Sequence, residues 1–290
     1  MNQQVIDKPG TEIETTAQIQ IKEKSPYVSR GGEKLAKALA EFGIPVQGRI
    51  CLDGGISTGG FTDCLLQAGA KQVYGIDVGY GQVDWRLRND PRVILRERTN
   101  LRYLQPADLY GEAPPPTPPY PGGETGKAPT PPYPGGETAE SSTSSYQGGE
   151  TGEAPTPPYQ GGETGGVYPD LGVVDVSFIS LTKILEALWN LLRSPREVVL
   201  LVKPQFEVGR SRVGKKGVVR DPNDHADAIF QVLQAAQKLG WVYKGLTWSP
   251  VTGPAGNIEY LLWLEMDSQM PPPNLEAIKQ ITQSARRTFV

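Results

Sequence analysis

The sequence predicts an α/β fold built on a mostly parallel, doubly wound sheet. Short apolar segments typical of buried strands alternate along the chain with amphipathic helical segments. A glycine-rich loop follows the first apolar segment and opens a helix, an arrangement typical of ligand-binding α/β sheets. The last two apolar segments, 241–248 and 258–264, are predicted to close the sheet as a strand pair.

The first half of the alternation lies between residues 32 and 95. Residues 32–43 carry Leu35, Leu39 and Phe42 on one stripe and end at Gly43, which predicts an amphipathic helix. The other predicted elements of this half are strands at 49–53, 72–77 and 93–95 and a helix at 59–69.

The alternation resumes at residue 171. Residues 197–202, EVVLLV, are predicted to form another strand, which Lys203-Pro204 ends. Apolar residues from Leu181 to Leu188 lie on one helical face. The other predicted elements are a strand at 171–176 and helices at 181–192, 224–239 and 274–288.

An insert of different composition, residues 111–166, separates the two halves. It contains 13 of the chain's 27 Pro and 13 of its 34 Gly, with seven Glu, one Lys and no Asp. Units of the form Tyr-(Pro/Gln)-Gly-Gly-Glu-Thr begin every 13 residues, at Tyr120, Tyr133, Tyr146 and Tyr159. Because the unit has almost no aliphatic side chains to bury, we predict a disordered repeat linker inside one domain rather than a folded repeat.

Charge and composition exclude several classes of protein. The net charge of the chain is -3, but the insert contributes -6, so the remainder is weakly basic and compatible with a nucleic-acid partner. The sequence has no apolar run of about 18 residues and no signal peptide pattern. Cys51 and Cys64 are predicted to be packing residues, and His225, the single histidine, structural or exposed. We therefore expect a cytoplasmic protein with no membrane partner and no metal.

The glycine-rich loop, residues 53–60 (DGGISTGG), lets the backbone approach a ligand closely beside a helix N-terminus. Its spacing is not G-x-G-x-x-G, which weakens a dinucleotide interpretation. Asp77 ends the second strand, 24 positions after Asp53, where an acidic residue can bind two ribose hydroxyls. A nucleoside-bearing cofactor and a plain glycine turn with a capping Asp both fit this pattern.

Four ionisable residues are predicted to converge on the sheet edge that carries this loop. Asp175 and Lys203 lie where their strands end, and Glu259 begins the last strand, which reaches the same edge if it runs antiparallel. Lys34 begins a helix of ~12 residues, about 18 Å long, that returns along a first strand of about 17 Å to that edge. A single Lys or Glu is ordinarily part of a surface ion pair, but four at one edge favour an active site.

Eight segments follow one another along the chain in a recognisable order: YVSRGGEKL (27–35), LDGGISTGGFTD (52–63), DVGYGQ (77–82), ERTN (97–100), DVSFISL (175–181), KPQFE (203–207), GVVRDP (217–222) and GPAGNIEY (253–260). By these segments the chain resembles the TlyA-type ribosomal RNA methyltransferases, also called the hemolysin A family, a branch of the FtsJ-like 2′-O-ribose methyltransferases. The similarity covers nearly all of residues 25–265 outside the insert.

The resemblance implies a Rossmann-like class I methyltransferase fold, a seven-stranded sheet with one antiparallel strand, and S-adenosylmethionine as methyl donor. It implies 2′-O-methylation of ribosomal RNA at a cytidine, with rRNA or ribosomal subunits as partners. It also implies a catalytic tetrad, Lys34, Asp175, Lys203 and Glu259, with Lys203 as general base. Burial and the Lys34 cation favour the neutral lysine that this role requires, while the two carboxylates oppose it. The implied cofactor-binding residues are Asp53, Gly55, Ser57, Thr58, Gly59, Gly60, Asp77 and Asn100.

The resemblance also divides the chain. Residues 1–24 resemble the remnant of an S4-type RNA-binding domain, without the two helices that normally precede its final hairpin. Residues 25–267 form the methyltransferase domain, interrupted by the insert, and 268–290 a C-terminal tail with a short helix. The loop carries Ile56 where the family commonly has Ala, which we expect to perturb cofactor binding without abolishing it.

Two basic clusters favour RNA contact. Six arginines lie between Arg86 and Arg102, and five cations between Arg210 and Arg220. Tyr27 and Trp85 could stack bases. The alternative function is a non-catalytic RNA-binding or ribosome-assembly factor that keeps the fold. A membrane-lysing protein, as the hemolysin name suggests, lacks an apolar span or pore-forming segment to support it.

Overall fold

The computed structural model describes residues 14, 16, 25–111 and 168–289. The predicted S4-type remnant at 1–24 lies outside the described residues apart from residues 14 and 16. The predicted insert at 111–166 also lies outside them, apart from Gly111.

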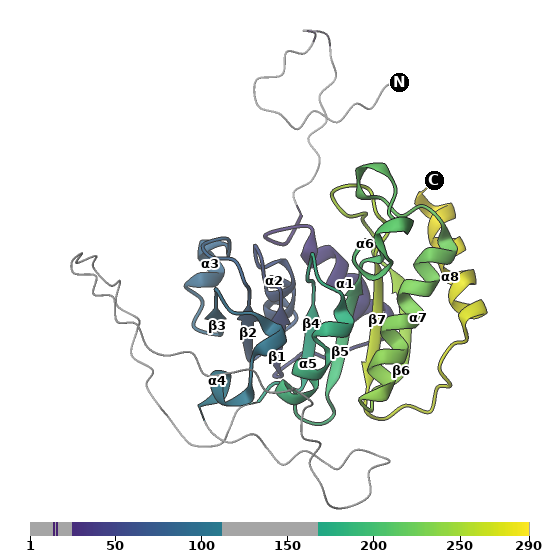
Figure 1. Cartoon of the computed structure of the whole chain (residues 1–290). Helices are drawn as coiled ribbons and strands as arrows, with labels where there is room; N and C mark the ends of the chain where they lie inside the picture. The colour runs from purple at the N-terminus through teal and green to yellow at the C-terminus, as the bar shows by residue number, and fades with distance from the viewer. Residues whose placement is uncertain (1–13, 15, 17–24, 112–167, 290) are drawn as a thin grey trace, which may run out of the picture.

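A seven-stranded sheet forms the centre of the molecule (Figure 1). The strand order is β3-β2-β1-β4-β5-β7-β6, and β7 alone runs antiparallel to its neighbours. This confirms the predicted doubly wound, mostly parallel sheet with one antiparallel strand. The strands are β1 (Ile50–Gly54), β2 (Gln72–Ile76), β3 (Val93–Arg96), β4 (Leu171–Val174), β5 (Glu197–Val202), β6 (Val242–Trp248) and β7 (Tyr260–Glu265).

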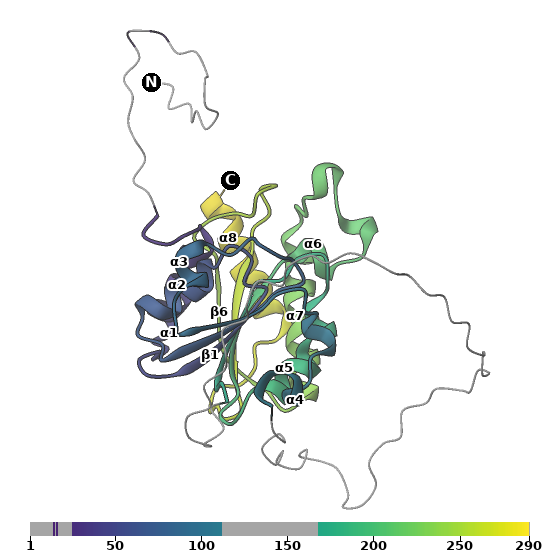
Figure 2. The same cartoon turned by 90° about the vertical axis from the view of Figure 1, so that its left-hand side faces the viewer.

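Helices cover both faces of the sheet (Figure 2). Successive residues of β5 show why: Val198 and Leu200 pack in the core beneath α5 and α7, while Val199 and Leu201 pack in the core beneath α1 and α2. A strand buried on both faces needs apolar residues at every position, which explains its unbroken apolar run. The helices are α1 (Gly31–Phe42), α2 (Gly60–Gln67), α3 (Trp85–Arg88), α4 (Pro106–Tyr110), α5 (Leu185–Leu191), α6 (Pro204–Glu207), α7 (Pro222–Lys238) and α8 (Leu275–Phe289).

Some predicted boundaries were wrong. The helix expected at 181–192 is divided into a 3₁₀ turn, Leu181–Lys183, and α5. The Ser180 side chain caps this turn by accepting a hydrogen bond from the backbone N–H of Thr182. The strand expected to end at residue 176 ends at Val174. Helices α3, α4 and α6 were not predicted because four or five residues are too few to show a helical period.

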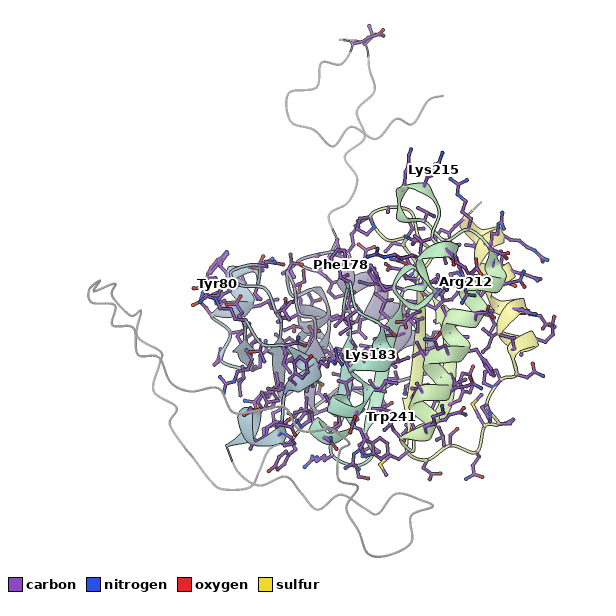
Figure 3. The ribbon with its side chains drawn as sticks, viewed as in Figure 1. Tyr80, Phe178, Lys183, Arg212, Lys215 and Trp241 are labelled. Atoms are coloured by element: carbon purple, nitrogen blue, oxygen red, sulfur yellow. The ribbon has the colours of Figure 1, made fainter. Side chains whose placement is uncertain are left out.

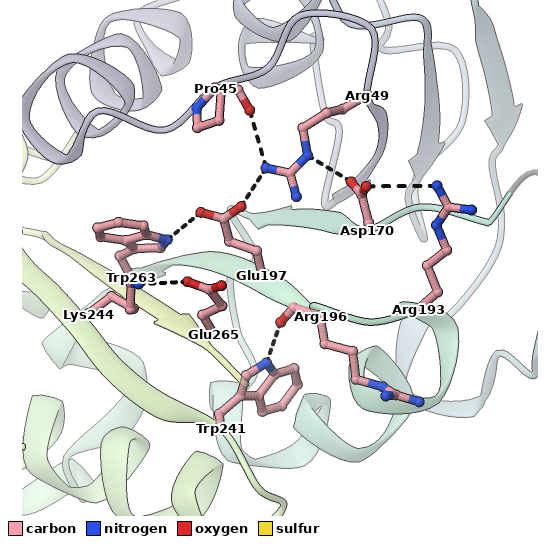
Figure 4. A network of polar contacts seen from close by, with 10 residues as sticks. All are labelled: Pro45, Arg49, Asp170, Arg193, Arg196, Glu197, Trp241, Lys244, Trp263 and Glu265. Atoms are coloured by element: carbon pink, nitrogen blue, oxygen red, sulfur yellow. Dashed lines mark hydrogen bonds and ion pairs between the residues drawn. The ribbon is translucent and has the colours of Figure 1, made fainter. Parts of the chain in front are cut away.

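A buried ionic network fastens the amino-terminal edge of the sheet (Figure 4). Arg49, which precedes β1, donates through Nε to Asp170 Oδ1 at 2.8 Å and through Nη1 to Glu197 Oε2. Asp170 precedes β4, and Glu197 begins β5. The indole of Trp263, on β7, donates to the other oxygen of Glu197 at 2.7 Å. One guanidinium thus joins the starts of three parallel strands.

Replacing Arg49 by Met is expected to lower the free energy of unfolding by about 3 kcal/mol, because two mostly buried carboxylates would lose their cation. Urea denaturation of the full chain measures this change. The control is Lys279→Met, which breaks an exposed pair with Glu276 and should change stability by less than about 0.5 kcal/mol. Equal effects of the two substitutions would contradict the assignment.

Candidate active site

The glycine-rich loop lies where the strand order reverses, between β1 and β4, the position at which open α/β sheets bind ligands. Gly55 has φ +88°, and a Cβ there would lie 2.4 Å from the backbone oxygen of Asp175. Only glycine fits this close approach. The loop is therefore packed directly against the segment that carries one of the predicted catalytic residues.

The side chain of Ile56 fills the space beside a glycine of β2. Ile56 is buried, and a Cβ added at Gly75 would lie 2.4 Å from Ile56 Cδ1. The absence of a side chain at Gly75, on the neighbouring strand, therefore makes room for Ile56. The loop backbone keeps its hydrogen bonds to β2, because the N–H groups of Gly55 and Ile56 both donate to Ile76 O.

The predicted cofactor residues separate into exposed and buried groups. Ser57, Thr58 and Asn100 are exposed, and Asp77 is half-buried beside them, accepting hydrogen bonds from the backbone N–H groups of Ser57 at 2.8 Å and Gly79 at 2.7 Å. Gly59 and Gly60 are buried, and their missing side chains leave room for Leu87 and for Ser29 and α1, respectively. The exposed group is available to a ligand, while the two buried glycines allow close packing under the loop.

Asp53 lies wholly buried beneath the loop. Its Oδ2 accepts a hydrogen bond from Thr62 Oγ1 at 2.7 Å, and its Oδ1 has no partner among the described residues. Burial raises the pKa of Asp53 to about 7. The Thr62 hydrogen bond lowers this pKa, and the negative charge of Asp175 raises it. A carboxyl group with an unused acceptor is thus held beneath the loop.

The predicted tetrad forms two ion pairs at the carboxyl edge of the sheet. Lys34 Nζ lies 2.5 Å from Glu259 Oε2, and Lys203 Nζ lies 2.6 Å from Asp175 Oδ1. The side chains of both lysines are only 10% exposed. Pairing of Val202 with Tyr260 in the sheet puts the following residue, Lys203, beside the preceding one, Glu259.

Three residues that the sequence analysis did not select support these pairs. Ser177 Oγ accepts a second hydrogen bond from Lys203 Nζ, at 2.8 Å. The buried carboxylate of Glu207 accepts hydrogen bonds from Ser180 Oγ at 2.5 Å and from the backbone N–H of Leu181 at 2.8 Å. Glu207 therefore joins the segment after Lys203 to the segment after Asp175. Ser177, Ser180 and Glu207 lie in the segments DVSFISL and KPQFE, which the sequence analysis had singled out. Their contacts become visible only when the structure brings the two segments together.

An exposed aromatic side chain lies beside the Lys203–Asp175 pair. Phe178 is 92% exposed and has φ +65°, an uncommon conformation for a residue with a side chain. Its ring packs against that of Phe206, with the ring centroids 5.2 Å apart. Lys203 Nζ lies 6.0 Å from the centroid of the Phe206 ring, so the site presents a ring to solvent close to the buried Lys203.

The remaining ionisable core groups take no part in this site. Cys51 and Cys64 are buried, and burial raises the pKa of each thiol to about 12, which confirms their packing role. His225 was predicted to be structural or exposed. It is buried, which confirms the first of these alternatives.

An open sheet with this strand order, one antiparallel strand and a glycine-rich loop at the switch point is the fold of class I methyltransferases. The chain belongs to the FtsJ-like methyltransferase family, whose model matches residues 27–266. It is 40% identical to the 16S/23S rRNA (cytidine-2′-O)-methyltransferase TlyA of Mycobacterium tuberculosis, over 89% of this chain and 76% of that protein.

Two further relatives span more of the chain. The protein YqxC of Bacillus subtilis is 40% identical over 99% of this chain and 84% of its own length. The solved structure of a hemolysin-type protein from Streptococcus thermophilus is 37% identical, covers 92% of this chain and 77% of that one, and superposes with a TM-score of 0.69. These similarities confirm the resemblance inferred from the eight sequence segments.

The contact between Ile56 and Gly75 predicts a compensating pair. Gly75→Ala alone should destabilise the protein by about 1–3 kcal/mol, because its methyl group meets the Ile56 side chain. In the double variant Ile56→Ala/Gly75→Ala this clash is absent. The change in its free energy of unfolding should therefore differ from the sum of the two single-variant changes by at least about 1 kcal/mol. A double-mutant cycle by urea denaturation measures the coupling, and additive effects would contradict the contact.

Proposed function

We propose that this protein transfers a methyl group from S-adenosylmethionine to a ribose 2′-hydroxyl of ribosomal RNA, at a cytidine. The observation that carries the proposal is the pair of ion pairs, Lys34–Glu259 and Lys203–Asp175, at the sheet edge beside the glycine-rich loop. The similarity to an rRNA cytidine-2′-O-methyltransferase supports the same activity and substrate. An rRNA substrate places this activity in the cytoplasm. The described residues contain no helix that is long and apolar enough to cross a membrane.

The loop offers features that fit S-adenosylmethionine. Ser57 and Thr58 are exposed beside Asp77, whose carboxylate can accept hydrogen bonds from ribose hydroxyls in addition to its backbone donors. Asp53 Oδ1 is a buried acceptor without a partner among the described residues. We assign the cofactor to these residues, with Gly55 and Asn100 beside them. When bound, the cofactor supplies an electrophilic methyl group.

Lys203, as the neutral amine, is assigned the role of accepting the proton of the 2′-hydroxyl as its oxygen attacks the methyl carbon. Asp175 and Ser177 fix the direction of the Lys203 amine, because both accept contacts from its nitrogen. Glu259 holds Lys34 in the same way. Positioning of the hydroxyl should supply much of the rate, since the transfer is an in-line displacement. The exposed ring of Phe178 offers a stacking surface for an unstacked base.

Methyl transfer to naked rRNA and to isolated ribosomal subunits tests this function. Lys203→Ala is expected to lower kcat by at least about 100-fold, as loss of a general base does, while cofactor binding by calorimetry remains. The matched control is Lys238→Ala, an exposed lysine at the end of α7, which should leave transfer unchanged. A wild-type protein that binds RNA and cofactor but transfers no methyl would instead favour the non-catalytic RNA-binding or assembly factor.

The pKa of Asp53 predicts how cofactor affinity changes with pH. Because burial raises this pKa to about 7, the free protein keeps Asp53 protonated at pH 6, whereas a cationic cofactor nearby favours the carboxylate. Affinity should therefore rise from pH 6 to pH 8 by up to about tenfold. Calorimetric titration of wild type and Asp53→Asn at both pH values measures this; the ligand's own titration cancels in the comparison. An equal pH dependence in both proteins would contradict the assignment.

A further inference from the structure

The structure distinguishes the two basic clusters of the sequence by how their charges are neutralised. In the first cluster, Arg86, Arg88 and Arg92 form ion pairs with Asp84, Glu97 and Asp90, at 3.1, 2.7 and 2.7 Å respectively. Two more arginines of this cluster lie over tyrosine rings. Much of its positive charge is therefore already matched within the protein.

The second cluster lies on a segment that we call the basic arm, residues 209–220. This segment contains five basic and no acidic residues. Arg212 is paired with Asp224 and Asp227. The other four cations are exposed and have no acidic partner among the described residues: Arg210, Lys215, Lys216 and Arg220.

The basic arm projects from the reactive edge of the sheet. It follows α6, which itself follows Lys203, and its outermost turn carries Lys215 and Lys216. Figure 3 shows Lys215 at the same end of the molecule as Phe178 and Tyr80, and Trp241 at the opposite end. The unmatched charge thus lies on the side of the molecule to which a substrate must come.

Two buried side chains fasten the root of the arm to the strand that carries Glu259. Asn257 accepts a hydrogen bond from the N–H of Val219 at 3.0 Å and donates to the oxygen of Gly217 at 2.9 Å. His225 lies 2.9 Å from the oxygen of Val219 through Nε2 and 2.8 Å from the hydroxyl of Tyr260 through Nδ1. Because a carbonyl can only accept, Nε2 donates to Val219. Burial lowers the pKa of His225 and so favours the neutral ring, in which Nδ1 accepts from the Tyr260 hydroxyl.

This anchoring keeps the arm at a fixed distance from the tetrad. Asn257 and Tyr260 flank Glu259 in the chain, and Asn257, Val219 and His225 are each at most 3% exposed. A charge held by such an anchor can position a bound polyanion relative to the reactive lysines, which a charge on a freely moving loop could not do.

We propose that the basic arm is the surface on which the phosphodiester backbone of the RNA substrate docks, and that Lys215 and Lys216 bind its phosphates. The inference rests on the proposed function and assigns part of its substrate recognition. Exposed, unmatched lysines bind phosphates without reading sequence, so the arm sets affinity and orientation, while the target nucleotide is selected elsewhere.

The test compares Lys215→Gln/Lys216→Gln with a control, Arg86→Gln/Arg92→Gln, which removes the same charge from exposed residues that are already paired. Binding to in vitro transcribed 16S and 23S rRNA is measured over a range of salt concentrations, beside methyl transfer. In the lysine variant the Kd for RNA should rise about tenfold, and the slope of log K against log salt should fall by about 1.4 to 1.8. The KM for RNA should rise, with kcat at saturating RNA and cofactor affinity unchanged.

Three results would overturn the inference: RNA binding by the lysine variant equal to that of wild type, a comparable loss in both variants, or a loss confined to binding of phosphatidylglycerol vesicles with RNA binding intact. The last result would identify an anionic membrane as the partner. Methyl transfer and RNA binding are measured separately, so a failure of the proposed function can be told from a failure of this inference. Wild type that transfers no methyl yet binds RNA through the two lysines would remove the enzymatic activity and leave the assignment of the arm.

Discussion

The guanidinium of Arg49, held between the carboxylates of Asp170 and Glu197, is the contact on which the alignment of the sheet depends. These residues stand at the starts of β1, β4 and β5, and 116 residues, 55–170, separate β1 from β4 along the chain. Local sequence cannot align strands across such a distance. A mostly buried cation between two mostly buried anions can, because displacing any one strand would leave a poorly solvated charge unpaired.

Aligned starts produce aligned ends. β1, β4 and β5 are four to six residues long, so parallel strands that begin together also end together. Their carboxyl ends deliver the glycine-rich loop, Asp175 and Lys203 to one edge, and the antiparallel β7 brings Glu259 there from its amino end. The contact of Gly55 with the Asp175 backbone then joins the proposed cofactor loop to the tetrad. A substitution that moved one would necessarily move the other.

Periodicity and strand ends were enough to predict most of this arrangement. The run EVVLLV was predicted as a strand, and the positions of Asp175 and Lys203 followed from where strands end. The supporting contacts could not be predicted in the same way. In the sequence Glu207 is an ordinary acidic residue, and its burial and its hydrogen bond from the backbone N–H of Leu181 depend on two segments meeting in space. The Ile56–Gly75 contact likewise joins residues that are not adjacent in sequence.

The two basic clusters show most clearly the difference between what the sequence predicts and what only the structure reveals. By sequence, the first basic cluster has six cations and the second five, so counting favours the first as a surface for RNA. Pairing reverses the order, because acidic neighbours two to nine residues away neutralise Arg86, Arg88 and Arg92. The basic arm contains no acidic residue, and Arg212 alone of its five cations forms an ion pair among the described residues, with Asp224 and Asp227 of α7. Within the tetrad, by contrast, each lysine is matched by one carboxylate. The protein thus keeps its reactive lysines paired and buried, where their direction is fixed, and leaves unpaired those cations whose position outside the core suits them to bind a polyanion.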